Sequence, residues 1–101
     1  MSKFYQEVYK KLRQVPKGKI TTYQDLAHAL NSRAYRAVGS AMAKNNDAPA
    51  TPCHRVINSN GLVGNYSADG GAETKIKMLK KEGIKIQDNK VLDYKKYLHK
   101  F

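Results

Sequence analysis

Apolar residues recur every four positions near the start of the chain, where Phe4, Val8 and Leu12 form one stripe. This period is that of an amphipathic helix whose apolar face lies on a core. The pattern predicts a helix from Lys3 to Val15, which the Pro-Lys-Gly-Lys segment at residues 16–19 should end. The first element of the fold is thus expected to be a surface helix packed through one face.

Two further short apolar patterns follow, separated by the Asn-Ser pair at residues 31–32. The first opens at residues 21–25, where threonine precedes Gln and Asp at a spacing typical of a helix N-cap. The second runs from about Arg33 to Lys44 and is rich in small residues. Two short helices around a tight turn predict a helix-turn-helix over about residues 22–44. Many helical hairpins bind nothing, so this pattern alone does not establish a DNA-binding role.

The next part of the chain predicts short strands. Residues 51–57 are partly extended in character, and an Asn-Gly step at residues 60–61 favours a small hairpin with residues 62–63. Residues 84–86 and 91–92 predict a second short hairpin. The β structure is therefore expected to be a minor part of the fold.

Two helical segments are expected in the C-terminal part. Thr74 should cap a helix that runs from Lys75 to about Glu82, with Gly83 as its stop. The last residues, Tyr94 to Phe101, predict one or two helical turns. The predicted fold class is mostly α with a minor β component, in a single small domain of the winged helix-turn-helix type.

The composition narrows the classes of protein that fit this pattern. The 101 residues suffice for one domain with one modest core, and 41% hydrophobic residues exclude a disordered chain. No apolar run approaches the roughly 20 residues that a membrane span needs, and residues 1–5 lack the apolar segment of a signal peptide. We expect a monomer of the cytoplasm or nucleus that does not bind membranes.

The charge balance points to a polyanionic partner. Lys and Arg total 19 against 8 Asp and Glu, which gives a formal net charge of +11. Such an excess raises the rate of encounter with nucleic acid, and secondarily with an anionic membrane surface. Nucleic acid is accordingly the first partner to consider.

The single cysteine, Cys53, restricts the chemistry. It excludes an intramolecular disulfide and a multi-cysteine zinc site, and the three histidines are scattered, so neither a metal nor a cofactor is expected. A buried structural thiol and a reactive thiol both fit. His54 and Arg55 are residue types that favour a thiolate, although neighbouring side chains on an extended segment point to opposite faces. A cysteine protease that uses His28 or His99 as its base also stays open.

Separated sequence blocks resemble the O6-alkylguanine-DNA alkyltransferase family. These blocks are Thr-Tyr-Gln at 22–24 with Leu-Ala at 26–27, Arg-Ala-Val-Gly at 36–39 with Ala-Met at 41–42, Pro-Cys-His-Arg-Val at 52–56 and Gly-Asn-Tyr-Ser at 64–67. They fall in the family's order at close to its distances. The resemblance covers nearly the whole chain and implies the family's C-terminal, catalytic domain, without the separate N-terminal domain that many members carry.

The resemblance implies a set of catalytic residues. Cys53 would be the alkyl acceptor, and His54, through a water held toward Glu82, would take the thiol proton. Asn45 would tie the recognition helix to the active-site turn. Tyr23 would rotate the phosphate of the target nucleotide and donate a hydrogen bond toward the guanine ring.

The resemblance also implies a DNA surface and a substrate pocket. Arg36 would enter the base stack through the minor groove and take the place of the flipped base, while small residues beside it permit close approach. The implied DNA-binding residues are Arg36, Ala37, Gly39, Arg55 and Tyr23. The implied pocket residues are Met42, Tyr66, Ser67, Val56, Lys75 and Asn65.

The function that follows from the resemblance is single-turnover DNA repair. The protein would flip O6-alkylguanine out of double-stranded DNA and transfer the alkyl group irreversibly to Cys53, as a methylated-DNA–protein-cysteine methyltransferase without a cofactor. An alternative is a non-catalytic alkyltransferase-like protein that flags alkylated bases for excision repair. Those proteins carry tryptophan where this chain has Cys53, which favours the acceptor function. A transcription-type helix-turn-helix module is a third, weaker option.

Overall fold

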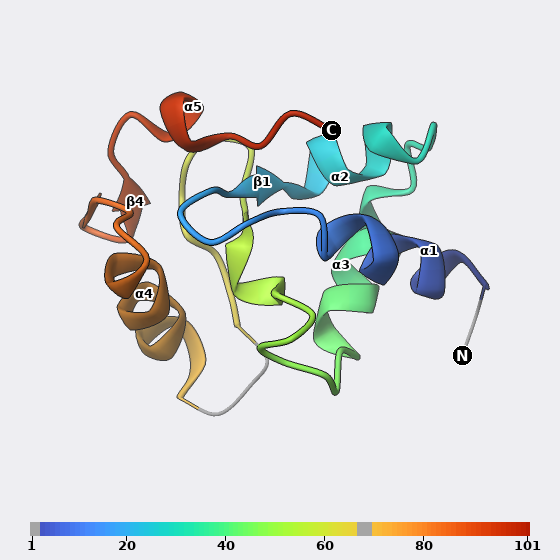
Figure 1. The fold of residues 1–101 in the computed structure, drawn as a ribbon, viewed down its shortest axis with the longest axis horizontal. Coiled ribbons are helices and arrows are strands. Elements are labelled where there is room, and N and C mark those ends of the chain that lie inside the picture. The colour runs from blue at the N-terminus through green and yellow to red at the C-terminus, as the bar shows by residue number, and fades with distance from the viewer. Residues whose placement is uncertain (1–2, 67–69) are drawn as a thin grey trace.

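The computed structural model describes residues 3–66 and 70–101 (Figure 1). The helices are α1 (Lys3–Leu12), α2 (Tyr23–Ala29), α3 (Tyr35–Ala43), α4 (Gly71–Lys81) and α5 (Tyr94–Tyr97), with a 3-10 turn, η1 (Cys53–Arg55). The strands are β1 (Thr21–Thr22), β2 (Val56–Ile57), β3 (Ile86–Gln87) and β4 (Lys90–Val91). The described chain is mostly helical with small sheets, which confirms the predicted fold class.

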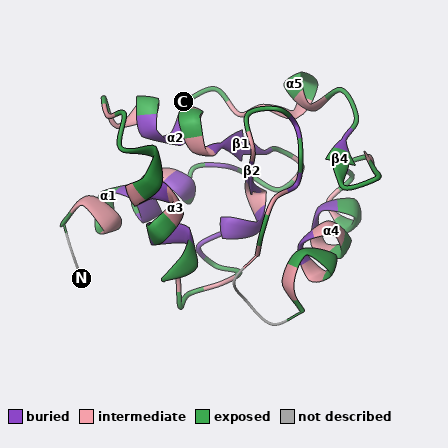
Figure 2. Cartoon of the chain, turned by 180° about the vertical axis from the view of Figure 1, so that it is seen from behind, coloured by how far each residue is buried: buried purple, intermediate pink, exposed green. Residues whose placement is uncertain are grey.

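Helices α1, α2 and α3 pack around the first of the two buried clusters in the described part of the chain, which consists of Val8, Tyr9, Leu12, Val15, Leu26, Ala27, Val38, Ala41, Met42, Cys53 and Val56. Figure 2 shows the buried positions on their inward faces and along β1 and β2. Helix α1 ends at Leu12, three residues before the predicted end at Val15. The amides of Gln14 and Val15 bond three residues back rather than four, so the chain tightens ahead of Pro16, which has no amide hydrogen to donate.

The helix-turn-helix forms as predicted, with a shorter second helix. Thr22 caps α2, because its hydroxyl accepts a hydrogen bond of 3.0 Å from the amide of Asp25. In the turn, Asn31 takes a left-handed conformation with φ of 55°. The Ser32 hydroxyl accepts from the amide of Ala34 at 3.0 Å. This local bond keeps the turn open until Tyr35, and α3 therefore begins two residues after the predicted start.

The two central strands pair in parallel, Thr21 with Val56 and Thr22 with Ile57. The predicted hairpin of residues 51–57 with 62–63 is thus wrong in its partner, although a turn does close between Asn58 and Leu62. Strand β2 is buried on both faces, so it lies between elements rather than at a surface edge. The pairing places the start of α2 beside the segment that carries Cys53.

The C-terminal part builds the second cluster. This cluster consists of Ile20, Ile57, Val63, Leu79, Ile84 and Val91. Strands β3 and β4 form the second predicted hairpin, with left-handed Asp88 and Asn89 in its turn. Only four residues of the predicted Tyr94–Phe101 segment are helical, because the chain then extends alongside Ile20, whose carbonyl accepts from the amide of His99 at 2.8 Å.

Helix α4 begins earlier than predicted, at Gly71. Its N-cap is Gly70, which has φ of 89° and offers no side-chain cap, so the prediction that Thr74 caps this helix is wrong. A Cβ atom at Gly70 would collide with the Thr74 hydroxyl, and the left-handed backbone there also favours glycine. Thr74 is therefore a residue of the first helical turn and not the residue that caps the start of the helix.

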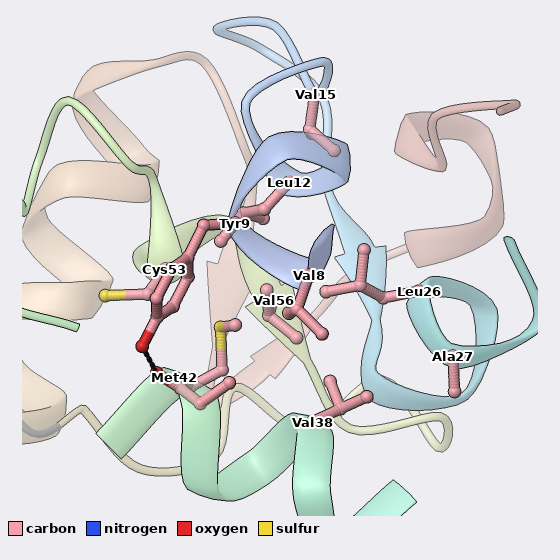
Figure 3. Packing of buried hydrophobic residues seen from close by; sticks show 11 residues of the cluster. Val8, Tyr9, Leu12, Val15, Leu26, Ala27, Val38, Met42, Cys53 and Val56 are labelled. Atoms are coloured by element: carbon pink, nitrogen blue, oxygen red, sulfur yellow. Dashed lines mark hydrogen bonds between the residues drawn. The ribbon is translucent and has the colours of Figure 1, made fainter. Parts of the chain in front are cut away.

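A buried tyrosine joins α1 to the end of α3 (Figure 3). The Tyr9 hydroxyl donates to the carbonyl of Ala41 at 2.7 Å, while the amide of Asn45 bonds to Met42. Tyr9→Phe should leave this carbonyl unsatisfied and lower the free energy of unfolding by about 1 to 3 kcal/mol, measured by urea denaturation. Tyr94→Phe is the matched control, because its hydrogen bond to the Ser59 carbonyl is exposed. Equal losses in both variants would contradict the assignment.

Candidate active site

One pocket of about 470 Å³ brings together residues that lie far apart in the sequence. It is lined by Tyr23, Tyr35, Gly39, Met42, Ala43, Cys53, Asn58, Gly64, Asn65 and Tyr66. Six of these were expected from the sequence. The sequence analysis missed Tyr35, although it lies one helical turn before Gly39 on the same face of α3.

Cys53 lies at the floor of this pocket as a free thiol that is only 5% exposed. It opens the 3-10 turn η1 and contributes to the same buried cluster as Met42 and Val56. Figure 3 shows its sulfur atom pointing away from the aliphatic side chains of that cluster. The thiol is thus held by the core, with its sulfur atom directed away from the aliphatic side chains and into the pocket lining.

His54 follows Cys53 and is buried against a carboxylate. Its Nε2 lies 3.0 Å from Oε2 of Glu82. A carboxylate only accepts hydrogen bonds, so Nε2 must carry the hydrogen and Nδ1 must present a lone pair in the neutral ring. Burial, opposed in part by Glu82, lowers the pKa of His54 below its ordinary value of 6.5. The imidazole is therefore neutral near pH 7.

The second nitrogen of His54 lacks a protein partner. Among the described residues, Nδ1 is the one buried side-chain nitrogen or oxygen without a hydrogen-bond partner. Buried polar atoms are normally satisfied, and exceptions concentrate where a water, a substrate or a proton transfer supplies the bond. The geometry therefore presents a bare base inside the protein, next in sequence to the thiol.

Arg55 holds Glu82 in place. Its Nε and one terminal nitrogen bond to the two carboxylate oxygens at 3.0 and 2.8 Å, and the other terminal nitrogen bonds to the Val15 carbonyl at 2.9 Å. Burial opposes ionisation of Glu82, but the hydrogen bonds from Arg55 and His54 outweigh it and hold the pKa of the carboxyl below its usual value. The expected DNA contact of Arg55 stays a prediction. His54 contacts Glu82 directly, and the expected water through which His54 takes the thiol proton stays a prediction.

Lys75 is fully buried behind the pocket wall. Its ammonium donates to the carbonyl of Asn65 at 3.1 Å. Burial lowers the pKa of Lys75 to about 8, and the charge of a Cys53 thiolate opposes that shift. Burial and then Cys53 raise the pKa of Tyr23 and Tyr66. A thiolate would thus be electrostatically coupled to side chains on three sides of the site.

Asn45 connects the end of α3 to the segment that precedes Cys53. Its amide nitrogen donates to the Thr51 carbonyl at 2.9 Å, and its oxygen accepts from the amide of Asp47 at 3.0 Å. The Arg13 side chain adds a bond of 2.9 Å to the Thr51 hydroxyl. Asn45 lies outside the pocket lining, so this placement suits a positioning role.

Several other expected residues lie outside the pocket lining. Val56 is fully buried in the core, which corrects the expectation that it lines the pocket. On α3, Arg36 is exposed and Ala37 is half-buried. Ser67 lies outside the described residues. The pocket therefore contains only part of the predicted set.

The described ranges, 3–66 and 70–101, contain neither a metal-ligand cluster nor a membrane-spanning helix. No group of three or more His, Cys, Asp or Glu side chains there could hold a metal ion. Within the same ranges, no helix has the length and apolar character to cross a membrane.

The sequence matches known proteins over most of its length. Residues 3–84 match the family model described as 6-O-methylguanine DNA methyltransferase, DNA binding domain. The bifunctional methyltransferase/endonuclease of Picrophilus torridus is 43% identical over 94 residues, which cover 92% of this chain and 30% of that protein. The methylated-DNA–protein-cysteine methyltransferase of Cricetulus griseus is 51% identical over 81 residues, covering 78% of this chain and 38% of that protein. The chain thus spans well under half of these two relatives.

Other relatives match along their full length or in structure. Alkyltransferase-like protein 1 of Schizosaccharomyces pombe is 33% identical over 96 residues, which cover 94% of this chain and 89% of that protein. The structure of S. pombe Atl1 in complex with damaged DNA containing O6-carboxymethylguanine superposes with a TM-score of 0.86 at 30% identity, covering 99% of this chain and 97% of that one. Mycobacterium tuberculosis OGT in complex with DNA gives 0.78 at 36% identity, over 82% of this chain and 50% of that one. The chain belongs to the 6-O-methylguanine DNA methyltransferase family.

Proposed function

We propose that this protein binds double-stranded DNA, extrudes O6-alkylguanine and transfers the alkyl group to Cys53. The observation that carries this proposal is the thiol in the pocket followed by His54, whose Glu82 contact leaves Nδ1 as an unpartnered base among the described residues. A thiol nucleophile and a base beside it are what an SN2 transfer of an alkyl group from oxygen to sulfur requires. The relatives named as methyltransferases support the same reaction class.

In the proposed reaction, Cys53 is the nucleophile, His54 is the base and Glu82 stabilises the charge on His54. His54 Nδ1 accepts the thiol proton, directly or through one water, and Glu82 stabilises the imidazolium that results. The Cys53 thiolate attacks the alkyl carbon, so an S–C bond forms while the bond from carbon to guanine O6 breaks. The electron pair stays on the departing base as a guanine anion, which takes up a proton at its ring nitrogen from water, while the imidazolium of His54 returns the thiol proton to water. We propose that Tyr23 and Ser67 donate hydrogen bonds that stabilise the departing base.

The transfer should occur once per molecule. The product is a thioether on Cys53, and the chain has no second cysteine to remove the group. A thioether is a poor leaving group in water at neutral pH, so no turnover follows. The protein would act as a stoichiometric acceptor without a cofactor, and we propose that it does so as a monomer.

DNA engagement is proposed for α3. The formal charge of +11 favours phosphate contacts, and Arg36 is exposed on this helix near Gly39, which lines the pocket. An arginine side chain that occupies the vacated place in the base stack offsets part of the cost of extruding the base. The pocket with Cys53 would then receive the extruded guanine.

Arg36→Ala should lower lesion binding and the transfer rate by about 10- to 100-fold, because alanine is too short to fill the place in the base stack that the extruded base leaves. Fluorescence anisotropy with a duplex that contains one O6-methylguanine measures the binding. Arg33→Ala is the matched control, because Arg33 is also exposed and its loss removes the same charge just before α3. The melting temperature should not change in either variant. Equal effects of both variants would leave Arg36 as an ordinary phosphate contact.

The proposed reaction is tested by intact-protein mass spectrometry after mixing with an O6-methylguanine duplex. The expected result is a gain of one methylene per chain, located on Cys53 by peptide mapping, with no further gain at excess DNA. An unchanged mass would contradict the transferase function.

A non-catalytic lesion-binding protein is the second candidate. The full-length structural likeness to S. pombe Atl1, with a TM-score of 0.86, favours it. It predicts tight binding that prefers the alkylated duplex, without any change in protein mass. The same experiment, combined with the anisotropy measurement, therefore separates the two functions.

A further inference from the structure

Tyr35 is a pocket residue to which the proposed chemistry gives no role. It is the first residue of α3 and lines the same pocket as Cys53. Its exposed fraction is 38%, which is high for a large aromatic ring, so it is not a core residue. Gly39 and Met42 follow on the same helix face and also line the pocket. The ring therefore stands at the mouth of the pocket and Cys53 lies at its floor.

A contact from α2 holds the Tyr35 ring. The Tyr35 hydroxyl lies 2.6 Å from Nε2 of His28, and the two rings meet edge to face with centroids 5.6 Å apart at 69°. Exposed aromatic side chains without such a contact rotate freely and lose that freedom on binding a ligand. His28 therefore orders the ring before any ligand arrives.

Space lies open beside the ring. A Cβ atom added at Gly39, one helical turn after Tyr35, would meet no atom within 4 Å beyond its chain neighbours and the backbone of its own helix. Tyr23 and Tyr66 bring two more aromatic rings to the same pocket. The absence of a side chain at Gly39 thus leaves this part of the pocket, which has a volume of about 470 Å³, free for a planar ligand.

We infer that Tyr35 contacts the extruded nucleotide at the pocket mouth, with its ring packed on the base or the deoxyribose and His28 as the positioning residue. This inference rests on the proposed function and adds a residue that determines selectivity for the lesion. Aromatic rings stack on any base because every base has a π-face, and the net charge of +11 on the chain attracts DNA phosphates. A ring at the mouth contacts only a nucleotide that has left the duplex. The contact should therefore favour lesion DNA over intact DNA.

The test is equilibrium binding by fluorescence anisotropy, in a Cys53→Ser background so that no reaction occurs. Two otherwise identical duplexes are compared, one with O6-methylguanine and one with guanine. Tyr35→Ala should weaken binding of the lesion duplex by about 5- to 100-fold, as for loss of one base stack, and binding of the intact duplex by less than about twofold. Tyr35→Phe retains the ring and should lose about fivefold or less. Tyr35→Leu retains apolar bulk without a planar ring and should resemble Tyr35→Ala.

The role of His28 is tested with the same duplexes. His28→Ala and Tyr35→Phe each remove the interhelical bond, so the double variant should be no weaker than the weaker single variant. Additive losses would overturn the positioning role. Unchanged lesion binding in Tyr35→Ala, or an equal loss on both duplexes, would overturn the contact itself. If the Cys53→Ser protein with Tyr35 intact shows no preference for the lesion, the proposed function fails and this inference fails with it.

Discussion

Cys53→Ser is expected to abolish alkyl transfer while lesion binding changes by no more than about threefold. A serine hydroxyl is a far weaker nucleophile than a thiolate, because a histidine base alone ionises it very little. The side chains have nearly the same size, and residue 53 is buried with 5% exposure, so the pocket should keep its shape. Intact-protein mass measures the transfer, and anisotropy with an O6-methylguanine duplex measures the binding.

Two results would change the assignment of Cys53. Loss of lesion binding along with transfer would mean that the thiol supports the pocket structure. A mass gain that persists in Cys53→Ser would place the acceptor elsewhere, and Lys75 is the nearest candidate because burial lowers its pKa to about 8. Peptide mapping distinguishes these cases. The matched control is the wild-type chain with an unmodified duplex. This mixture should show no mass gain, and the binding should be weaker than binding of the O6-methylguanine duplex.

Local signals predicted the parts of the fold that depend on sequence neighbours. The Thr22 cap, the turn at Asn31 and the β3–β4 hairpin each involve residues a few positions apart, and each forms close to the predicted place. The parallel pairing of β1 with β2 was missed, since its partners are separated by most of the N-terminal half of the chain. A turn signal at residues 60–61 shows that the chain reverses there, but it does not say which strand lies beside Val56.

In the site, too, features that depend on neighbouring residues were predicted, and features that depend on distant residues were not. The motif at residues 52–56 identified the thiol and its neighbouring histidine, but adjacency did not reveal that Arg55 turns inward. That orientation depends on Glu82 and on the carbonyl of Val15, which lie far from Arg55 in the sequence. The direction of a charged side chain follows from where the opposite charge lies in space, and a single sequence does not contain that distance. An arginine of the active-site motif can therefore hold the site together through partners that are distant in the sequence.

Glu82→Gln is expected to slow transfer by about 10² to 10⁴-fold with only a small effect on lesion binding. The glutamine amide can donate to Nε2 of His54, which the carboxylate cannot, and that bond would move the imidazole hydrogen to Nδ1. The base next to the thiol would then be lost although the fold stays intact. Arg55 would also lose its charged partner, so unfolding should cost roughly 1 to 3 kcal/mol less. Single-turnover kinetics and urea denaturation measure the two effects.

The dependence on pH gives this prediction an independent check. In the wild-type protein the pKa values of His54 and Glu82 both lie below their ordinary values. Each group then binds fewer protons folded than unfolded, so stability declines as pH falls, first below about 6.5 through His54 and then below about 4.5 through Glu82. Glu82→Gln should remove the second decline, while Glu73→Gln, an exposed change in the first turn of α4, should leave the transfer rate unchanged. A wild-type transfer rate in the Glu82→Gln protein would instead mean that His54 does not act as the base, because its hydrogen would no longer be held on Nε2.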